Sequence, residues 1–276
     1  MDRFECYELC VQSPRHVAAF LRGVHGNEPV VLREDFCGTA AVSRRWCEEA
    51  IRRGDDGRAV AVDFDAETVA KARELVKSDA LEGRLRLVCG DALPKPALAA
   101  VADPADVVFV GNFSIGYIKE RETLVAYLKL CHRRLAAGMG GFGGGVFVCD
   151  LYGGASAYKL GGLERRHPSR GREVVRYSWQ HEAADQVSGM VTNSISFRVE
   201  VDGEVVQEWP RAFVYEWRLW SLPELREAMR EAGFASVEVY KDVNVAPGER
   251  PAPILNAAEI GEDWIVLVVA RLGNSE

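Results

Sequence analysis

Five short apolar runs alternate with helical segments along the first half of the chain, and this alternation constrains the fold more than any other feature. The runs occupy residues 30–35, 59–63, 85–89, 106–112 and 144–152. Between them, apolar residues recur at helical spacing over segments 36–54, 67–79 and 120–136. Strands without a polar side are typical of a parallel sheet covered by helices on both faces. The sequence therefore predicts an α/β fold with a doubly wound, mostly parallel sheet.

The hydrophobic period changes to two between residues 173 and 217, where apolar and polar residues alternate. Asp202-Gly203 interrupts this region with a dipeptide that favours a two-residue hairpin turn. Beyond it, helical spacing returns, and two more apolar runs follow at 236–240 and 264–271. The pattern predicts an antiparallel sheet inserted into the α/β domain.

The chain opens with a predicted helix over 13–24, which has Ser13 as N-cap and Pro14 in its first turn. The predicted parts are an N-terminal helical cap over 1–28, a main domain over 29–152 and 218–276, and the inserted sheet over 153–217.

Composition narrows the function classes. The 41 acidic and 34 basic residues give a net charge of −7, which disfavours a surface built to follow nucleic acid. Seven cysteines without a C-x-x-C pair indicate reduced thiols, and no histidine pair has metal-ligand spacing, so no metal is expected. No run approaches the length of a membrane span, and we expect a cytoplasmic protein with no membrane partner.

The first apolar run ends in a tight turn, and ligands of open α/β sheets bind at such strand ends. The sequence there, "VLREDFCGTA" over 31–40, resembles the first motif of the class I S-adenosylmethionine-dependent methyltransferase family, small-molecule type. The segment "EWRLWSLPELREAMREAGF" resembles the family's part that follows an inserted sheet. The resemblance implies a Rossmann-like fold with an antiparallel last strand, S-adenosylmethionine as cofactor and S-adenosylhomocysteine as product.

The resemblance further implies cofactor contacts at the ends of the first four strands. Phe36 and Ala40 stand where the family has glycine, so close approach of the backbone to the ligand rests on Gly38. Asp63 matches the acidic residue that accepts hydrogen bonds from both ribose hydroxyls, while Asp65 is expected to cap the next helix. The implied cofactor-binding residues are Glu34 with its neighbour and rival Asp35, Cys37, Gly38, Thr39, Asp63, Phe64, Asp91, Ala92, Asn112 and Phe113.

Other interpretations of these residues remain open at this point. A nicotinamide enzyme also has an acidic residue after its second strand, but the G-x-G-x-x-G spacing is missing. Taken singly, Asp91 and Asn112 also fit surface turns, and Phe113 also fits the core. The cofactor prediction therefore rests on the ordered series of landmarks.

Methyl transfer is an in-line displacement, so alignment and exclusion of water supply much of the catalysis and a strong base is optional. Tyr117, Tyr152 and Tyr215 are the candidate catalytic hydrogen-bonding groups, although each also fits ordinary packing. Trp179, Asn193, Arg211 and Trp217 are the candidate substrate-binding residues of the inserted sheet. Asn193 interrupts an apolar face, so it requires a hydrogen-bond partner, either backbone or ligand. The sheet is expected to serve as a lid over a small-molecule acceptor or as a homodimer interface.

Five arginines surround His167 in "LERRHPSRGREVVR" over 163–176. The segment is interpreted first as a solvated loop, with an anion clamp and a nucleic-acid contact as alternatives. The leading function is methyl transfer to a small molecule. The alternatives are a methyltransferase for RNA or protein, which would bind polyanions in a salt-sensitive way, and a nonenzymatic S-adenosylmethionine-binding protein.

Overall fold

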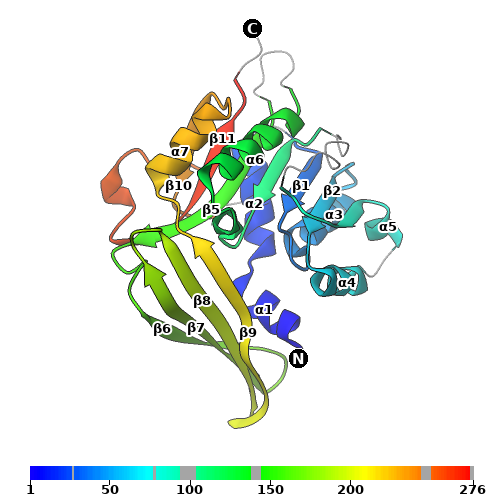
Figure 1. Ribbon diagram of the computed structural model, residues 1–276. Helices are drawn as coiled ribbons and strands as arrows, with labels where there is room; N and C mark the ends of the chain where they lie inside the picture. The colour runs from blue at the N-terminus through cyan, green and yellow to red at the C-terminus, as the bar shows by residue number, and fades with distance from the viewer. Residues whose placement is uncertain (27, 77–78, 94–103, 138–143, 244–249, 274–276) are drawn as a thin grey trace.

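The computed structural model describes residues 1–26, 28–76, 79–93, 104–137, 144–243 and 250–273. Within these ranges the chain forms a seven-stranded sheet flanked by helices and a separate four-stranded sheet, which extends from one end of the larger sheet (Figure 1).

The large sheet has the strand order β10-β11-β5-β4-β1-β2-β3. Its strands are β1 (Val31–Asp35), β2 (Arg58–Asp63), β3 (Leu85–Cys89), β4 (Val107–Val110), β5 (Val146–Gly154), β10 (Ser236–Tyr240) and β11 (Asp263–Arg271). The first five are parallel, and β11 runs antiparallel to both of its neighbours. The predicted mostly parallel sheet with an antiparallel last strand is confirmed. The order reverses between β1 and β4, so a ligand crevice is expected at their carboxyl ends.

Helices cover both faces of this sheet, as predicted. One face packs against α2 (Pro14–His25), α3 (Ala41–Arg53) and α4 (Ala66–Leu75), which contribute Phe20, Trp46 and Ala72 to one apolar cluster. The other face packs against α6 (Arg121–Arg134) and α7 (Leu222–Glu231), which contribute Leu128 and Met229 to a second cluster. Short elements are α5 (Asp79–Glu82), η2 (Ser114–Tyr117) and η3 (Ala257–Glu259).

The small sheet has the antiparallel order β6-β7-β8-β9. Its strands are β6 (Gly161–Pro168), β7 (Glu173–Asp185), β8 (Met190–Val201) and β9 (Glu204–Arg218). The predicted hairpin is confirmed, because Asp202 and Gly203 both have positive φ and join β8 to β9. The interpretation of residues 163–168 as part of a loop is wrong. They form an edge strand that is mostly exposed, so they carry no apolar alternation.

The sequence patterns did not predict α1 (Arg3–Val11), which lies between the two sheets (Figure 1). Asp2 and Glu5 form a capping box at its start. Its Cys6 joins the apolar cluster of the small sheet. On its other side, Asp2 pairs with Lys71 of α4 at 2.6 Å and Arg3 with Glu67 at 2.7 Å. The helix thus links the inserted sheet to the main domain.

Candidate active site

The first turn, residues 36–40, reverses the chain between β1 and α3. Phe36, Gly38 and Ala40 have φ values of 57°, 55° and 56°. For a residue with a side chain this left-handed conformation costs roughly 1–2 kcal/mol. An added Cβ on Gly38 would meet no atom within 4 Å, so open space lies over the middle of the turn. The backbone therefore has the glycine-type geometry of the family motif even where glycine is absent.

Asp63, at the end of β2, holds this turn from the neighbouring strand. Its Oδ2 accepts a hydrogen bond from the Gly38 amide at 2.8 Å, and its Oδ1 accepts one from the Asp65 amide at 2.9 Å. Burial raises the pKa of Asp63. Asp65 caps α4 by accepting from the Thr68 amide, as predicted. Asp63 thus lies beside the backbone of the turn, and one of its two carboxylate oxygens binds the turn.

Glu34 and Asp35 are adjacent in β1 and point to opposite faces of the sheet. Glu34 Oε2 accepts from the amide and hydroxyl of Ser43 at 2.9 and 2.5 Å. It therefore caps α3, whose N-cap residue Ala40 has no side chain for this purpose. Burial raises the pKa of Glu34 to about 7.

Asp35 lies in the core on the α6 side and does not join the turn. It is fully buried, pairs with Arg33 at 2.9 Å and accepts from the Tyr127 hydroxyl at 2.9 Å. Of the two rival acidic residues, Glu34 is the one that shares the face of the turn's helix.

The N-terminal helix covers the first turn. Thr39 donates its hydroxyl proton to Glu8 Oε1 at 2.5 Å, and Arg44 binds the same oxygen. Cys37 is buried, and burial raises the pKa of its thiol. Thr39 thus links the turn to α1, and Cys37 belongs to the apolar cluster that includes α2 and α3.

The remaining predicted cofactor residues on this side follow β2 and β3, which are adjacent and parallel. Phe64 is 65% exposed, whereas Ala92 is 5% exposed. Asp91 accepts from the Leu93 amide at 2.9 Å. These residues share one edge of the sheet with Asp63, as an adenosine site would require.

The second turn, residues 111–113, leaves β4 on the other side of the switch point. Asn112 and Phe113 have φ values of 55° and 60°. Asp150, in β5, accepts hydrogen bonds from both of their amides, at 2.8 Å for Asn112 and 2.6 Å for Phe113. Desolvation raises the pKa of Asp150 to about 7. Asp150 was not among the site residues predicted from the sequence, although it follows an apolar run as Asp63 does.

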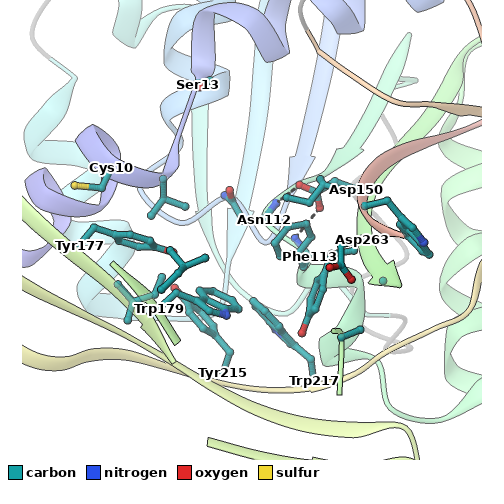
Figure 2. A pocket seen from close by; sticks show the side chains of 18 of the residues that line it. Cys10, Ser13, Asn112, Phe113, Asp150, Tyr177, Trp179, Tyr215, Trp217 and Asp263 are labelled. Atoms are coloured by element: carbon teal, nitrogen blue, oxygen red, sulfur yellow. Dashed lines mark hydrogen bonds between the residues drawn. The ribbon is translucent and has the colours of Figure 1, made fainter. Parts of the chain in front are cut away.

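A cavity of about 640 Å³ opens beside the second turn (Figure 2). Its walls come from the ends of β4 and β5, the inner face of the small sheet, α1 and the start of β11. The side chains that line it come from opposite sides, as Figure 2 shows. They include Asn112, Phe113, Asp150, Tyr152, Tyr177, Trp179, His181, Tyr215, Trp217, Tyr7, Cys10, Arg165 and Asp263.

Two of the three candidate catalytic tyrosines, Tyr152 and Tyr215, line this cavity. Tyr117 is not among the lining residues and packs between the rings of Phe36 and Trp217, with centroids 6.3 and 6.0 Å away. Burial raises the pKa of Tyr152 and of Tyr117 to about 12. Both hydroxyls therefore stay protonated near neutral pH and are hydrogen-bonding groups.

The candidate substrate residues divide into two pairs. Trp179 and Trp217 line the cavity, where Tyr215 stacks on Trp217 at 4.5 Å. Asn193 is fully buried behind this wall and donates to the Tyr152 hydroxyl at 3.1 Å. Arg211 lies outside the cavity, is exposed and pairs with Glu182 at 2.8 Å.

His181 was not among the site residues predicted from the sequence, yet it also lines the cavity. Its Nδ1 is buried without a hydrogen-bond partner among the described residues, and burial lowers its pKa. A neutral imidazole at this wall is able to accept a proton.

Acidic neighbours pair with several arginines of the basic segment. Arg166 and Arg176 both contact Glu200, and Arg172 contacts Asp202 at 3.1 Å. Arg165 instead lines the cavity. In the described part of the chain, no group of three His, Cys, Asp or Glu side chains is arranged to hold a metal ion. No helix in that part has the length and apolarity to cross a membrane.

Neither a protein-family model nor a curated protein matches this sequence. Solved structures do match along nearly its whole length. An S-adenosylmethionine-dependent methyltransferase from Clostridium acetobutylicum ATCC 824 has a TM-score of 0.67 at 17% identity, with 98% of each chain covered. CalS10, an amino pentose methyltransferase from Micromonospora echinaspora with bound S-adenosylmethionine, gives 0.66 at 16% identity, covering 99% of this chain and 98% of that one.

KedS8, a sugar N-methyltransferase from Streptoalloteichus sp ATCC 53650, gives 0.64 at 14% identity, covering 99% of this chain and 93% of its own. All three agree with the fold implied by the motif in the first turn. The chain has the fold of the class I S-adenosylmethionine-dependent methyltransferases.

Proposed function

We propose that this protein transfers a methyl group from S-adenosylmethionine to an amine nitrogen of a small molecule bound in the aromatic cavity. The observation that carries the proposal is the cavity itself, which opens at the second turn. That turn leaves β4, the strand next to β1 and the first turn. The site thus offers adjacent places for a methyl donor and an acceptor at the switch point of the sheet.

The residues of the first turn fit the cofactor. Open space over Gly38 admits a ligand close to the backbone, and Asp63 presents a carboxylate at the strand end beside it. Phe64, Asp91 and Ala92 would hold the adenosine half, and Asn112 with Phe113 would face the methionine half. S-adenosylmethionine would supply a methyl group already activated by its sulfonium.

An amine acceptor suits the rings of the cavity. Nitrogen attacks as a neutral amine and becomes a cation, and faces of Trp and Tyr rings attract cations. Trp179, Tyr215 and Trp217 line one wall of the cavity, where their rings stack or tilt against one another at interplanar angles of 20° to 30°. The amino pentose and sugar N-methyl activities of CalS10 and KedS8 support the same acceptor class.

His181 is the group best suited to take the proton that the nitrogen loses. Burial lowers its pKa and so favours the neutral imidazole, and its Nδ1 has no hydrogen-bond partner among the described residues. The tyrosine hydroxyls, with raised pKa values, would orient the acceptor instead.

His181 also favours a second candidate, methyl transfer to a hydroxyl group. A hydroxyl needs a general base nearby, and a neutral imidazole on the cavity wall meets that need. Loss of His181 should affect the two acceptors differently, because only the hydroxyl depends on it for nucleophilicity.

The test combines binding and turnover on the wild-type protein. Calorimetry should detect S-adenosylmethionine and S-adenosylhomocysteine but not NAD. A panel of matched primary amines and alcohols, sugars included, with RNA and protein as further acceptors, should then give S-adenosylhomocysteine with the small amines. Binding without turnover across the panel would favour a nonenzymatic binder, and turnover only with RNA or protein would contradict a small-molecule acceptor.

A further inference from the structure

We infer that Asp150 is a positioning residue, whose carboxylate sets the second turn so that Asn112 and Phe113 lie where the methionine half of the cofactor would meet the acceptor. The inference rests on the proposed function for its catalytic consequence. The geometry of the turn can be tested without it.

The placement of Asp150 follows from strand register. β4 and β5 are parallel, and Val110 pairs with Cys149. Asp150 therefore lies one residue beyond the last paired position, level with the start of the turn. From there its Oδ2 accepts from the Asn112 amide at 2.8 Å and its Oδ1 from the Phe113 amide at 2.6 Å.

The turn needs such support, because two consecutive residues with side chains have positive φ. Left-handed geometry is unfavourable for both and persists only where surrounding contacts enforce it. Hydrogen bonds from backbone amides to a carboxylate are among the stronger ones in proteins. Among the described residues no cation pairs with Asp150, so the two amides are its principal partners.

The turn places two side chains at the cavity opposite the inserted sheet. The Phe113 ring packs against Tyr152 and Trp217, with centroids 4.8 and 5.9 Å away. Asn112 lines the same cavity (Figure 2). A change at Asp150 would therefore move groups on the side from which the methyl group is expected to arrive.

A second carboxylate of the large sheet, Asp106, serves as a comparison because it lies away from the cavity. Asp106 Oδ2 accepts from the amides of Val30 and Val31, each at 2.8 Å, at the opposite end of the sheet. It also accepts from two consecutive amides, but through one oxygen where Asp150 uses two, and it does not line the cavity. Asp106→Asn therefore controls for the loss of a carboxylate charge beside two consecutive amides.

The experiment compares Asp150→Asn with Asp106→Asn and wild type. With an amine acceptor from the panel, Asp150→Asn should lower kcat by about 100-fold, because small displacements of aligned groups cost that much, and should raise KM for S-adenosylmethionine by a smaller factor. Asp106→Asn should leave both constants unchanged. An unchanged kcat in Asp150→Asn, or parallel losses of kcat and thermal stability in both variants, would overturn the inference.

Amide NMR spectra supply a readout independent of turnover. At pH 8, above the pKa of Asp150, the Asn112 and Phe113 amide signals should shift upfield in Asp150→Asn and stay in place in Asp106→Asn, since only the first variant removes their charged acceptor. If wild type turned over no acceptor while these signals shifted, the proposed function would fail and the role of Asp150 in the turn would stand. Signals that do not move would overturn that role even in an active enzyme.

Discussion

The turns that follow β1 and β4 use the same device, a left-handed backbone held by a carboxylate from the next strand outward. Asp63 of β2 holds the first turn, and Asp150 of β5 holds the second. The two carboxylates flank the switch point of the sheet, since β1 and β4 are its central pair.

They differ in how many bonds each gives to its turn. Both oxygens of Asp150 bind amides of the second turn, whereas Asp63 gives one oxygen to Gly38 and the other to Asp65. Open space over Gly38 lies beside the first turn, while the rings of Tyr152 and Trp217 pack on the second. The comparison indicates that the first turn is built to admit a ligand and the second to keep one shape.

Gly38→Val should weaken ligand binding at the first turn and produce the largest effect. A β-branched residue at this φ is strained by about 1–3 kcal/mol, and its side chain would enter the open space. We expect the dissociation constant for S-adenosylmethionine in calorimetry to rise by about 100-fold or more. Gly203→Val is the control, because Gly203 also has positive φ and open space but lies in the distal hairpin. Unchanged affinity in Gly38→Val would show that no cofactor lies over this turn.

Asp63→Ala should have the next largest effect. It removes the acceptor for the Gly38 amide and the carboxylate expected to bind the ribose. Hydrogen bonds to a charged group contribute about 1.5–3 kcal/mol, so affinity for S-adenosylmethionine should fall by about 10- to 100-fold. Asp65→Ala removes only the α4 cap and should cost about 1 kcal/mol of stability with affinity retained. If Asp63→Ala bound normally, the two carboxylates would be alike, both serving only their turns.

Sequence patterns predicted those parts of the fold that depend on local burial. The apolar runs became the parallel strands, and Asp202-Gly203 became the hairpin, because each encodes its own structure. The edge strand β6 was not predicted because its residues are mostly exposed and so show no apolar alternation. α1 was not predicted because its capping box was the main local sign of a helix, and the residues it packs against are distant in sequence.

The candidate site was predictable only where a local stretch of sequence encodes it. The first turn and Asp63 stood out through a motif, whereas Asp150 and His181 gain their roles from neighbours in space. The structure places His181 in register with Asn193 across two strands and beside a cavity that α1 helps to close. No spacing in the sequence encodes that arrangement.

Glu34→Gln tests the first turn through the pH dependence of stability, because the turn leads into α3, which is capped by the Glu34 carboxyl group with its raised pKa. Folded Glu34 keeps its proton between about pH 4.5 and about 7, where the unfolded chain has lost it. The free energy of unfolding should therefore fall as pH rises through this window. Glutamine cannot ionise and can still accept from Ser43, so the variant should be more stable than wild type at pH 8 by about 1–3 kcal/mol and nearly equal at pH 4.5. Urea unfolding at both pH values measures the difference, and a constant difference would contradict a raised pKa.

Ala40→Gly tests whether the first turn is as strained as its φ values indicate, and it should give the smallest effect. Glycine removes about 1–2 kcal/mol of left-handed strain but loses a buried methyl group and gains unfolded-state entropy, each roughly 0.8 kcal/mol. We expect the free energy of unfolding to stay within about 1 kcal/mol of wild type.

Ala50→Gly is the matched control, since Ala50 is also fully buried but lies inside α3. There glycine relieves nothing and costs about 1 kcal/mol of helix propensity plus the buried methyl group. Ala50→Gly should therefore be the more destabilised of the two in urea unfolding. Equal losses would mean that residue 40 carries no strain, and the first turn would then need no carboxylate to hold it as the second turn does.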